Sequence, residues 1–185
     1  MGKLVVLYGP SCSGKTEIAV NIGLEKVPTM TTRDKRENEV DGVDYHFTTK
    51  KKFNDLLRKG EIIEHTEYVG NFYGCPRKDI LETIKGDSSK VIVLDIKGVQ
   101  YLKNNFSSKN IKYVYIGANL ESIKRRLEER SIPEEELISR LSKAEVQELS
   151  HKYRELADEI IWNNDGMNIE DVVNHIKKLL KIWKY

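Results

Sequence analysis

The residues with the most specific chemistry lie at 9–16, where GPSCSGKT matches the phosphate-loop pattern G-x-x-x-x-G-K-[ST]. An apolar run, Lys3–Tyr8, precedes the motif and predicts a buried parallel strand, and a helix is expected from about Lys15. Glycines allow backbone N–H groups to turn inward around a phosphate, and the helix N-terminus adds its positive end. In such loops the lysine meets the β and γ phosphates and the threonine hydroxyl ligates Mg²⁺. The motif therefore predicts a nucleoside triphosphate site.

A second group of polar residues follows, and its members fit a nucleotide acceptor. Arg33 and Arg36 lie in a polar loop, where two guanidinium groups can bind a phosphate monoester through paired hydrogen bonds. A carboxylate such as Glu64 can accept from both N1–H and N2–H₂ of guanine, whereas adenine lacks the 2-amino group. Tyr45 and Tyr73 can offer hydroxyl groups to the same phosphate. Each residue alone has an ordinary interpretation as a surface charge or a core aromatic. Their spacing after a phosphate loop favours the acceptor site.

Residues 31–47, TTRDKRENEVDGVDYHF, resemble the guanylate kinase pattern T-T-R-x-x-R-x-G-E-x-x-G-x-D-Y-x-F. The resemblance continues at 63–64, 70–74, 93–95 and 124–130, in the family's order over nearly the whole chain. It implies transfer of the γ-phosphoryl group of ATP to GMP with Mg²⁺ as the cofactor. It also implies an α/β fold, a three-layer P-loop kinase with a parallel central sheet, a small mixed nucleotide-monophosphate-binding insertion and a helical lid.

The resemblance assigns roles to individual positions. The ATP-binding residues it implies are Gly9, Pro10, Ser11, Cys12, Ser13, Gly14, Lys15, Thr16 and Asn163, with Thr16 on the metal. The GMP-binding residues it implies are Thr29, Arg33, Arg36, Tyr45, Glu64, Tyr73, Gly74, Cys75 and Asp95. The catalytic residues it implies are Lys15, Asp95, Arg126, Arg130 and Arg140. Asp95 is expected near the Mg²⁺ and the acceptor phosphate. The three arginines are expected to move inward with the lid and neutralise charge on the transferring group. The alternative for them is a set of surface salt bridges with nearby glutamates.

Three departures from the family pattern bear on the acceptor. Asn38 replaces a glycine, and asparagine tolerates a left-handed backbone. Cys75 replaces the Ser or Thr that usually follows Tyr-Gly. After Asp95 the family has D-[IV]-D-x-Q-G, whereas this chain has Asp95-Ile-Lys-Gly98. Our alignment therefore loses two residues, including a second acidic group that contacts the acceptor nucleotide, and we expect weaker selection of GMP.

Strands and helices must alternate to position these residues. Further apolar runs at Val91–Ile96, Lys112–Ile116 and Ile160–Trp162 predict buried strands of a parallel sheet covered on both faces. Helices are expected around Gly98–Asn104, over Leu120–Arg130 and after Asn168, and Thr49 is expected to cap a helix over Lys50–Arg58. One guanylate-kinase-like domain results, with a core of 1–27, 86–127 and 141–185, a GMP-binding insertion of 28–85 and a lid of 128–140.

Composition sets the broad class. The chain has 185 residues, 39% of them hydrophobic, and its 31 basic residues nearly balance 29 acidic ones, so charge does not indicate nucleic-acid or membrane partners. No apolar run is long enough to cross a membrane. Two cysteines fit a reducing cytosol, and the four histidines lack zinc-like spacing. We expect a cytoplasmic monomer or homodimer whose partners are ATP and GMP.

Two rival functions remain open from the sequence. One is a kinase of the same fold with another acceptor monophosphate, such as a modified purine nucleotide or a sugar phosphate. The other is a non-catalytic guanylate-kinase-like module that binds protein ligands, although Lys15 and Thr16 argue against it. The cysteines give a further hypothesis. Cys12 beside the ATP phosphates and Cys75 beside the acceptor phosphate would have lowered pKa values and reactive thiols, unless both are buried and inert. A disulfide between them is not expected because the two loops should lie too far apart.

Overall fold

A five-stranded parallel sheet forms the centre of the molecule. The computed structural model describes residues 2–68, 70–106, 109–130 and 132–184. The predicted core, insertion and lid therefore each include residues outside the described part: Met1, Val69, Ser107, Ser108, Ser131 and Tyr185. The strands run in the order β2-β7-β1-β8-β9, and every pair is parallel. Their bounds are β1 Lys3–Tyr8, β2 Glu25–Lys26, β7 Ser89–Val93, β8 Ile111–Gly117 and β9 Glu159–Trp162.

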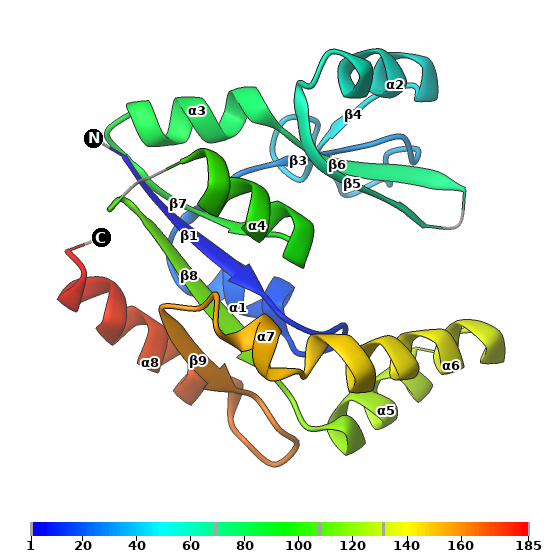
Figure 1. Cartoon of the computed structure of the whole chain (residues 1–185), viewed down its shortest axis with the longest axis vertical. Helices are drawn as coiled ribbons and strands as arrows, with labels where there is room; N and C mark the ends of the chain where they lie inside the picture. Colours follow the sequence, from blue (N-terminus) through cyan, green and yellow to red (C-terminus); the bar gives the residue numbers. More distant parts are fainter. Residues whose placement is uncertain (1, 69, 107–108, 131, 185) are drawn as a thin grey trace.

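Helices cover both faces of this sheet, as Figure 1 shows. Side chains alternate along β1, so Leu4 and Val6 join one buried cluster while Val5 and Leu7 join the other. The first cluster includes residues of α3 (Arg77–Lys85) and α4 (Ile96–Asn105), and the second includes residues of α1 (Lys15–Asn21) and α8 (Ile169–Ile182). The predicted three-layer α/β architecture is therefore confirmed.

A second, mixed sheet forms the insertion above the core (Figure 1). Its order is β4-β3-β6-β5, with β3 parallel to β4 and antiparallel to β6. The helix α2 packs Phe53 against Met30 and Ile62 of this sheet, and the Thr49 hydroxyl caps it by accepting from the Lys52 N–H at 3.2 Å. The bounds are β3 Thr29–Thr31, β4 Tyr45–Phe47, α2 Lys50–Arg58, β5 Ile62–Tyr68 and β6 Asn71–Pro76.

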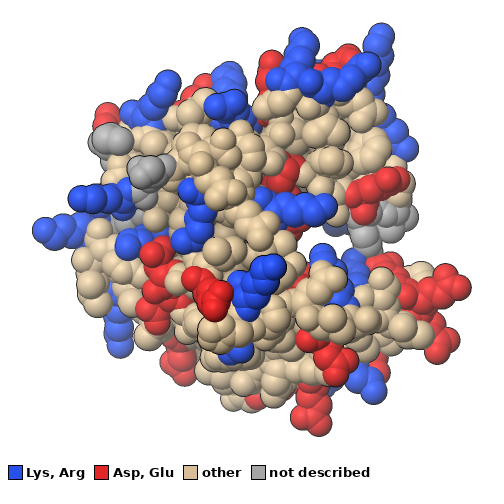
Figure 2. Space-filling view, viewed as in Figure 1, with Lys and Arg blue, Asp and Glu red and all other residues tan. Residues whose placement is uncertain are grey.

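A helical arm projects from the core at the lower right of Figure 1, below the insertion. It consists of α5 (Leu120–Glu128) and α6 (Glu134–Lys143), followed by one π-helical turn, η1 (Ala144–Glu148), and the short α7 (His151–Arg154). Figure 2 shows a hollow between this arm and the insertion, with charged side chains around it. The candidate site lies where the loops after β1 and β7 enter this region.

Several predicted boundaries differ from those observed. The strand expected to reach Ile96 ends at Val93, because Asp95 caps α4 by accepting the Gly98 N–H at 3.0 Å. Helix α3 lacked a clear sequence signal, and its Ile80 lies in the core cluster beneath α4 rather than in the insertion sheet. Among the described residues, no helix is both long and apolar enough to span a bilayer.

Candidate active site

The phosphate loop connects β1 to α1 in the predicted position. Gly9 and Gly14 have φ values of 138° and 89°, which favour glycine. A Cβ at Gly9 would lie 2.2 Å from the Ile116 carbonyl oxygen, so the loop passes too close to β8 for any other residue. Cys12 also has a positive φ, 61°, although it has a side chain. The loop is thus a strained turn that only its surroundings can hold.

Lys15 lies over the loop that it follows. Its Nζ donates to the Pro10 carbonyl at 2.5 Å and lies 3.4 Å from the Ser13 hydroxyl. Burial lowers the pKa of Lys15 to about 8, while the negative charge of Glu148 acts in the opposite direction. A donor pocket of about 530 Å³ opens beside it. Its lining residues are Ser11, Cys12, Gly14, Lys15, Thr16, Glu17, Val20, Asn21 and Arg130.

Asn163 holds the loop from the core side. The side chain is 4% exposed, and its Nδ2 donates to the Ser13 carbonyl at 3.0 Å. A Cβ on Gly14 would lie 2.4 Å from the same Nδ2. Asn163 was predicted near the adenine of ATP. In the structure its amide is buried and bound to the loop.

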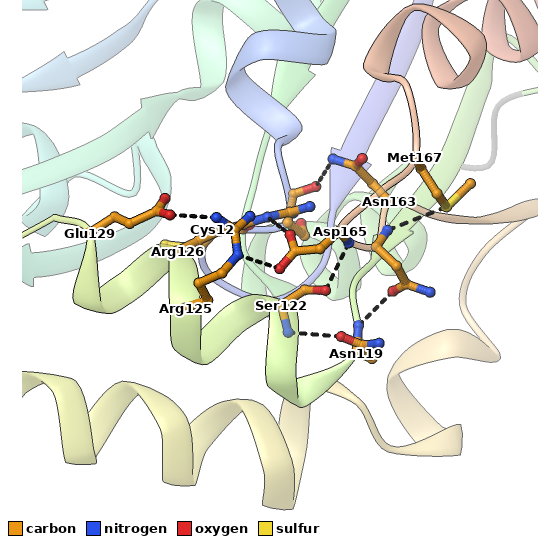
Figure 3. A network of polar contacts seen from close by, with 11 residues as sticks. Cys12, Asn119, Ser122, Arg125, Arg126, Glu129, Asn163, Asp165 and Met167 are labelled. Atoms are coloured by element: carbon orange, nitrogen blue, oxygen red, sulfur yellow. Dashed lines mark hydrogen bonds and ion pairs between the residues drawn. The ribbon is translucent and has the colours of Figure 1, made fainter.

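A polar network joins the loop to α5 (Figure 3). Asp165 accepts from Arg125 Nε at 2.6 Å and from Arg126 Nε at 2.9 Å, and these contacts lower the pKa of Asp165 to about 2. Arg126 Nη1 also donates to the Cys12 carbonyl at 3.1 Å. Arg126 therefore ties α5 to the loop in this conformation, and Arg130 lines the donor pocket.

The acceptor cleft lies on the other side of the loop. It has a volume of about 290 Å³ and is bounded by the loop, the insertion sheet and the loop between β7 and α4. Its lining residues are Gly9, Ser11, Lys15, Thr29, Tyr45, Glu64, Thr66, Tyr73, Gly74, Val93, Leu94, Asp95, Ile96, Glu148 and Tyr153. Six of the nine predicted GMP-binding residues are in this set: Thr29, Tyr45, Glu64, Tyr73, Gly74 and Asp95.

Glu64 and Asp95 come from different elements and meet in this cleft. Burial raises the pKa of Glu64 to about 8, and the charge of Asp95 and a hydrogen bond to it add to the effect. A Cβ on Gly98 would lie 2.9 Å from Glu64 Cγ, so the glycine makes room for this side chain. Asp95 was expected near the metal and the acceptor phosphate, with a second acidic group missing after it. The structure brings Asp95 to Glu64 in the cleft, and its expected position near the metal and the acceptor phosphate stays a prediction.

Arg33 lies at the rim of the same cleft. Its guanidinium carbon is 5.7 Å from the centre of the Tyr45 ring, and the group also hydrogen-bonds Tyr73. Nη2 of Arg33 lies 2.6 Å from Glu39 Oε1, and this contact raises the pKa of Arg33. The other oxygen of Glu39 accepts the backbone N–H of Arg36 at 2.8 Å, and Arg36 is exposed. The structure therefore brings the two arginines and the two tyrosines to one region, and their contact with an acceptor phosphate stays a prediction.

The hypothesis of a reactive thiol beside the acceptor phosphate is wrong for Cys75. Cys12 does line the donor pocket, but it is nearly buried. Cys75 is fully buried in the core cluster that also contains Ile63 and Val99, and it does not line the cleft. Burial raises the pKa of its thiol, and the carboxylates of Glu64 and Asp79 raise it further. Cys12 is only 9% exposed and belongs to the apolar cluster of the lid helices. Both thiols are free.

Two residues of the site, Glu148 and Tyr153, had no recognisable signal in the sequence. Glu148 accepts the Ser11 N–H at 3.3 Å. The predicted Arg140 contacts the same residue, because its Nη1 donates to the Ser11 hydroxyl at 3.0 Å. Tyr153 lines the acceptor cleft. Burial raises the pKa of its hydroxyl group, and the charges of Glu148 and Asp95 raise it further. Both unpredicted residues lie more than 130 positions from the loop, where local patterns carry no information about contact.

The oxygen ligands available in the donor pocket fit a metal ion that binds together with a nucleotide. Thr16 is exposed in the donor pocket, where its hydroxyl can contribute one oxygen ligand. The described residues contain no group of three or more His, Cys, Asp or Glu side chains arranged to hold a metal. Mg²⁺ commonly keeps several waters and takes further ligands from substrate phosphates, so a single hydroxyl beside a phosphate loop is compatible with it.

Comparison with known proteins agrees with this geometry. The guanylate kinase family model matches residues 1–182. A guanylate kinase of Malacoplasma penetrans is 33% identical over 184 residues, which cover 95% of this chain and 92% of the relative. That of Chlorobaculum tepidum is 34% identical, covering 97% and 94%. The crystal structure of guanylate kinase from Anaplasma phagocytophilum has a TM-score of 0.70 and 31% identity, covering 98% of this chain and 85% of that one. The chain therefore belongs to the guanylate kinase family.

Proposed function

We propose that this chain catalyses the reaction of its family, the transfer of the terminal phosphoryl group of ATP to GMP, through the residues described above. The observation that carries the proposal is the pair of sites that share Ser11 and Lys15. One is the donor pocket along the phosphate loop, and the other is the acceptor cleft beneath the insertion sheet. A phosphoryl group that leaves one site at Lys15 enters the other directly.

The acceptor cleft has a polar set that suits GMP at both ends. Arg33, with Arg36 nearby, supplies positive charge for the phosphate, and Tyr45 and Tyr73 supply hydroxyl groups. Glu64 and Asp95 supply carboxyl oxygens for the N1–H and N2–H₂ donors of guanine. Adenine offers an acceptor at N1 and no 2-amino group, so the same pair disfavours AMP. Thr29 lies on the cleft wall beside Tyr45.

The chemistry requires no covalent intermediate on the protein, because an oxygen of the acceptor phosphate is the nucleophile. The contribution of this chain is position and charge. Lys15 and the loop N–H groups bind the donor phosphates, and Arg130 already faces the donor pocket. Arg126 and Arg140 contact the loop at Cys12 and Ser11, from where closure of the lid brings their charges toward the transferring group. Mg²⁺ bound with ATP at Thr16 supplies further charge neutralisation.

The two rival functions differ from this proposal in testable ways. A protein-binding module needs neither Lys15 nor the free donor pocket, both of which the structure contains. A base-reading role for Glu64 argues against a sugar phosphate as the acceptor. We also place the protein in the cytoplasm, as a monomer or homodimer with ATP and GMP as its small-molecule partners. The two free, buried cysteines support that location.

The deciding experiment is a coupled assay of ADP release with ATP, Mg²⁺ and a panel of acceptors: GMP, dGMP, AMP, IMP, CMP, UMP and a sugar phosphate. We expect GMP to give the highest kcat/KM. A Lys15→Ala variant provides the background rate, since losing one such charge contact reduces turnover by roughly 100-fold or more. Preference for any other acceptor would refute the assignment of the cleft, and absence of ATP consumption with every acceptor would refute the enzyme itself.

A further inference from the structure

The carboxylate of Glu148 lies against the phosphate loop. Its Oε2 accepts the Ser11 backbone N–H at 3.3 Å, and the side chain is 12% exposed. The N–H groups of such a loop form a concave surface that binds anions. In this conformation, therefore, a carboxylate of the protein occupies one backbone donor of the loop.

Glu148 also lies at the junction of the two pockets. Ser11 and Lys15 line both the donor pocket and the acceptor cleft, and Glu148 lines the cleft beside them. The charge of Glu148 acts on Lys15, where it opposes the effect of burial. A negative group at this junction lies beside the two residues that both pockets share.

The backbone of Glu148 is anchored while its carboxylate is joined to the lid. The Tyr115 hydroxyl donates to the Glu148 carbonyl at 2.7 Å, and Leu149 N–H donates to the Ala144 carbonyl at 2.9 Å, five residues back, as in a π turn. Such turns occur frequently at functional sites. Lys143, the last residue of α6, places its Nζ 3.2 Å from Glu148 Oε1. The carboxylate thus bridges the lid helix and the loop.

We propose that Glu148 is an internal competitor for the donor phosphates, which ATP displaces from Ser11 when it binds. The inference rests on the proposed function, because it requires the loop to bind ATP. A phosphate oxygen and the carboxylate cannot both take the Ser11 N–H, and two negative groups in contact repel one another in a partly buried site. The displaced carboxylate keeps Lys143 as its partner, so occupation of the loop removes one of the links between α6 and the loop, while Arg140 on the same helix keeps its contact with the Ser11 hydroxyl. Glu148 thereby couples donor binding to the position of the lid.

The test is calorimetric titration of ATP with Mg²⁺, without GMP, into the wild-type protein and the Glu148→Gln and Glu148→Ala variants. If the carboxylate occupies the loop in about nine of ten molecules, its removal makes ATP bind roughly tenfold tighter. The matched control is Glu145→Gln, which removes the same charge from an exposed side chain on the same π turn. Its affinity for ATP should stay within about twofold of the wild-type value, as expected for a surface substitution.

Tighter binding in both Glu148 variants but not in the control supports the proposal. Unchanged or weaker binding in Glu148→Gln overturns it, and the same change in Glu145→Gln also overturns it, because a general effect of charge would then be sufficient. Melting temperatures show whether the variants are folded. If Glu148→Ala is not folded, Glu148→Gln decides, because its neutral amide binds the Ser11 N–H more weakly than a carboxylate does and does not repel a phosphate. A wild-type protein that binds no ATP refutes the proposed function instead.

Discussion

The carboxyl groups of Glu64 and Asp95 share a hydrogen bond inside the acceptor cleft. Two carboxyl groups can do so only when one of them keeps a proton, and burial raises the pKa of Glu64 to about 8. Glu64 is therefore largely protonated at neutral pH in this conformation. Guanine presents donors at N1 and N2, so bound GMP favours the deprotonated form, and the cleft must release a proton to accept its proposed substrate.

The stability of the protein should fall as the pH rises toward 8. Glu64 has an ordinary pKa of 4.5 when exposed and about 8 in the fold, so the folded state holds more protons in the interval between them. The free energy of unfolding then decreases by at most about 1.4 kcal/mol for each pH unit in this interval. Urea unfolding at several pH values between 5 and 9 measures it. Glu64→Gln, which resembles the protonated acid, should lack this component, and parallel curves for the two proteins would contradict the raised pKa.

Glu64 should determine which base the acceptor nucleotide carries. Glu64→Gln should reduce kcat/KM for GMP by roughly 100-fold or more and reduce it far less for AMP or IMP, because an amide presents its own N–H₂ to a guanine donor. Glu67→Gln is the matched control, since Glu67 is an exposed glutamate on the same strand. Acceptor kinetics with all three nucleotides check the prediction, and an equal loss on GMP and AMP would mean that Glu64 does not recognise the base.

Local signals predicted much of the fold. The strand Lys3–Tyr8, the Thr49 cap of Lys50–Arg58 and the Asn168 cap of the last helix were placed correctly from a few neighbouring residues. Asp95 shows where such reasoning fails. No local pattern indicated that Asp95 meets Glu64, because the two residues come from different elements. Glu148 escaped prediction because its contact with Ser11 joins positions 137 apart.

Alkylation should distinguish the observed placement of the cysteines from the one expected. Cys75 is fully buried, and burial raises the pKa of its thiol, so iodoacetamide should leave it unmodified in the folded protein. Cys12, packed among the lid helices, should react slowly. Peptide mapping after labelling in buffer and in urea measures both sites, and urea should expose both thiols. Rapid labelling of Cys75 in buffer, with protection by GMP, would restore the original hypothesis that it contacts the acceptor.

The loop should depend on Asn163 for its position rather than for contact with the nucleotide. Asn163→Ala removes a buried amide that donates to the Ser13 carbonyl and packs beside Gly14, leaving that carbonyl without its donor. Loss of such a hydrogen bond costs about 1–3 kcal/mol of stability. The displaced loop should raise KM for ATP more than KM for GMP, because the loop forms most of the donor pocket but only part of the wall of the acceptor cleft. Asn174→Ala, an exposed position on α8, is the control and should change stability by no more than about 0.5 kcal/mol. An Asn163→Ala protein with wild-type stability and wild-type KM for ATP would show that the loop keeps its shape without this support.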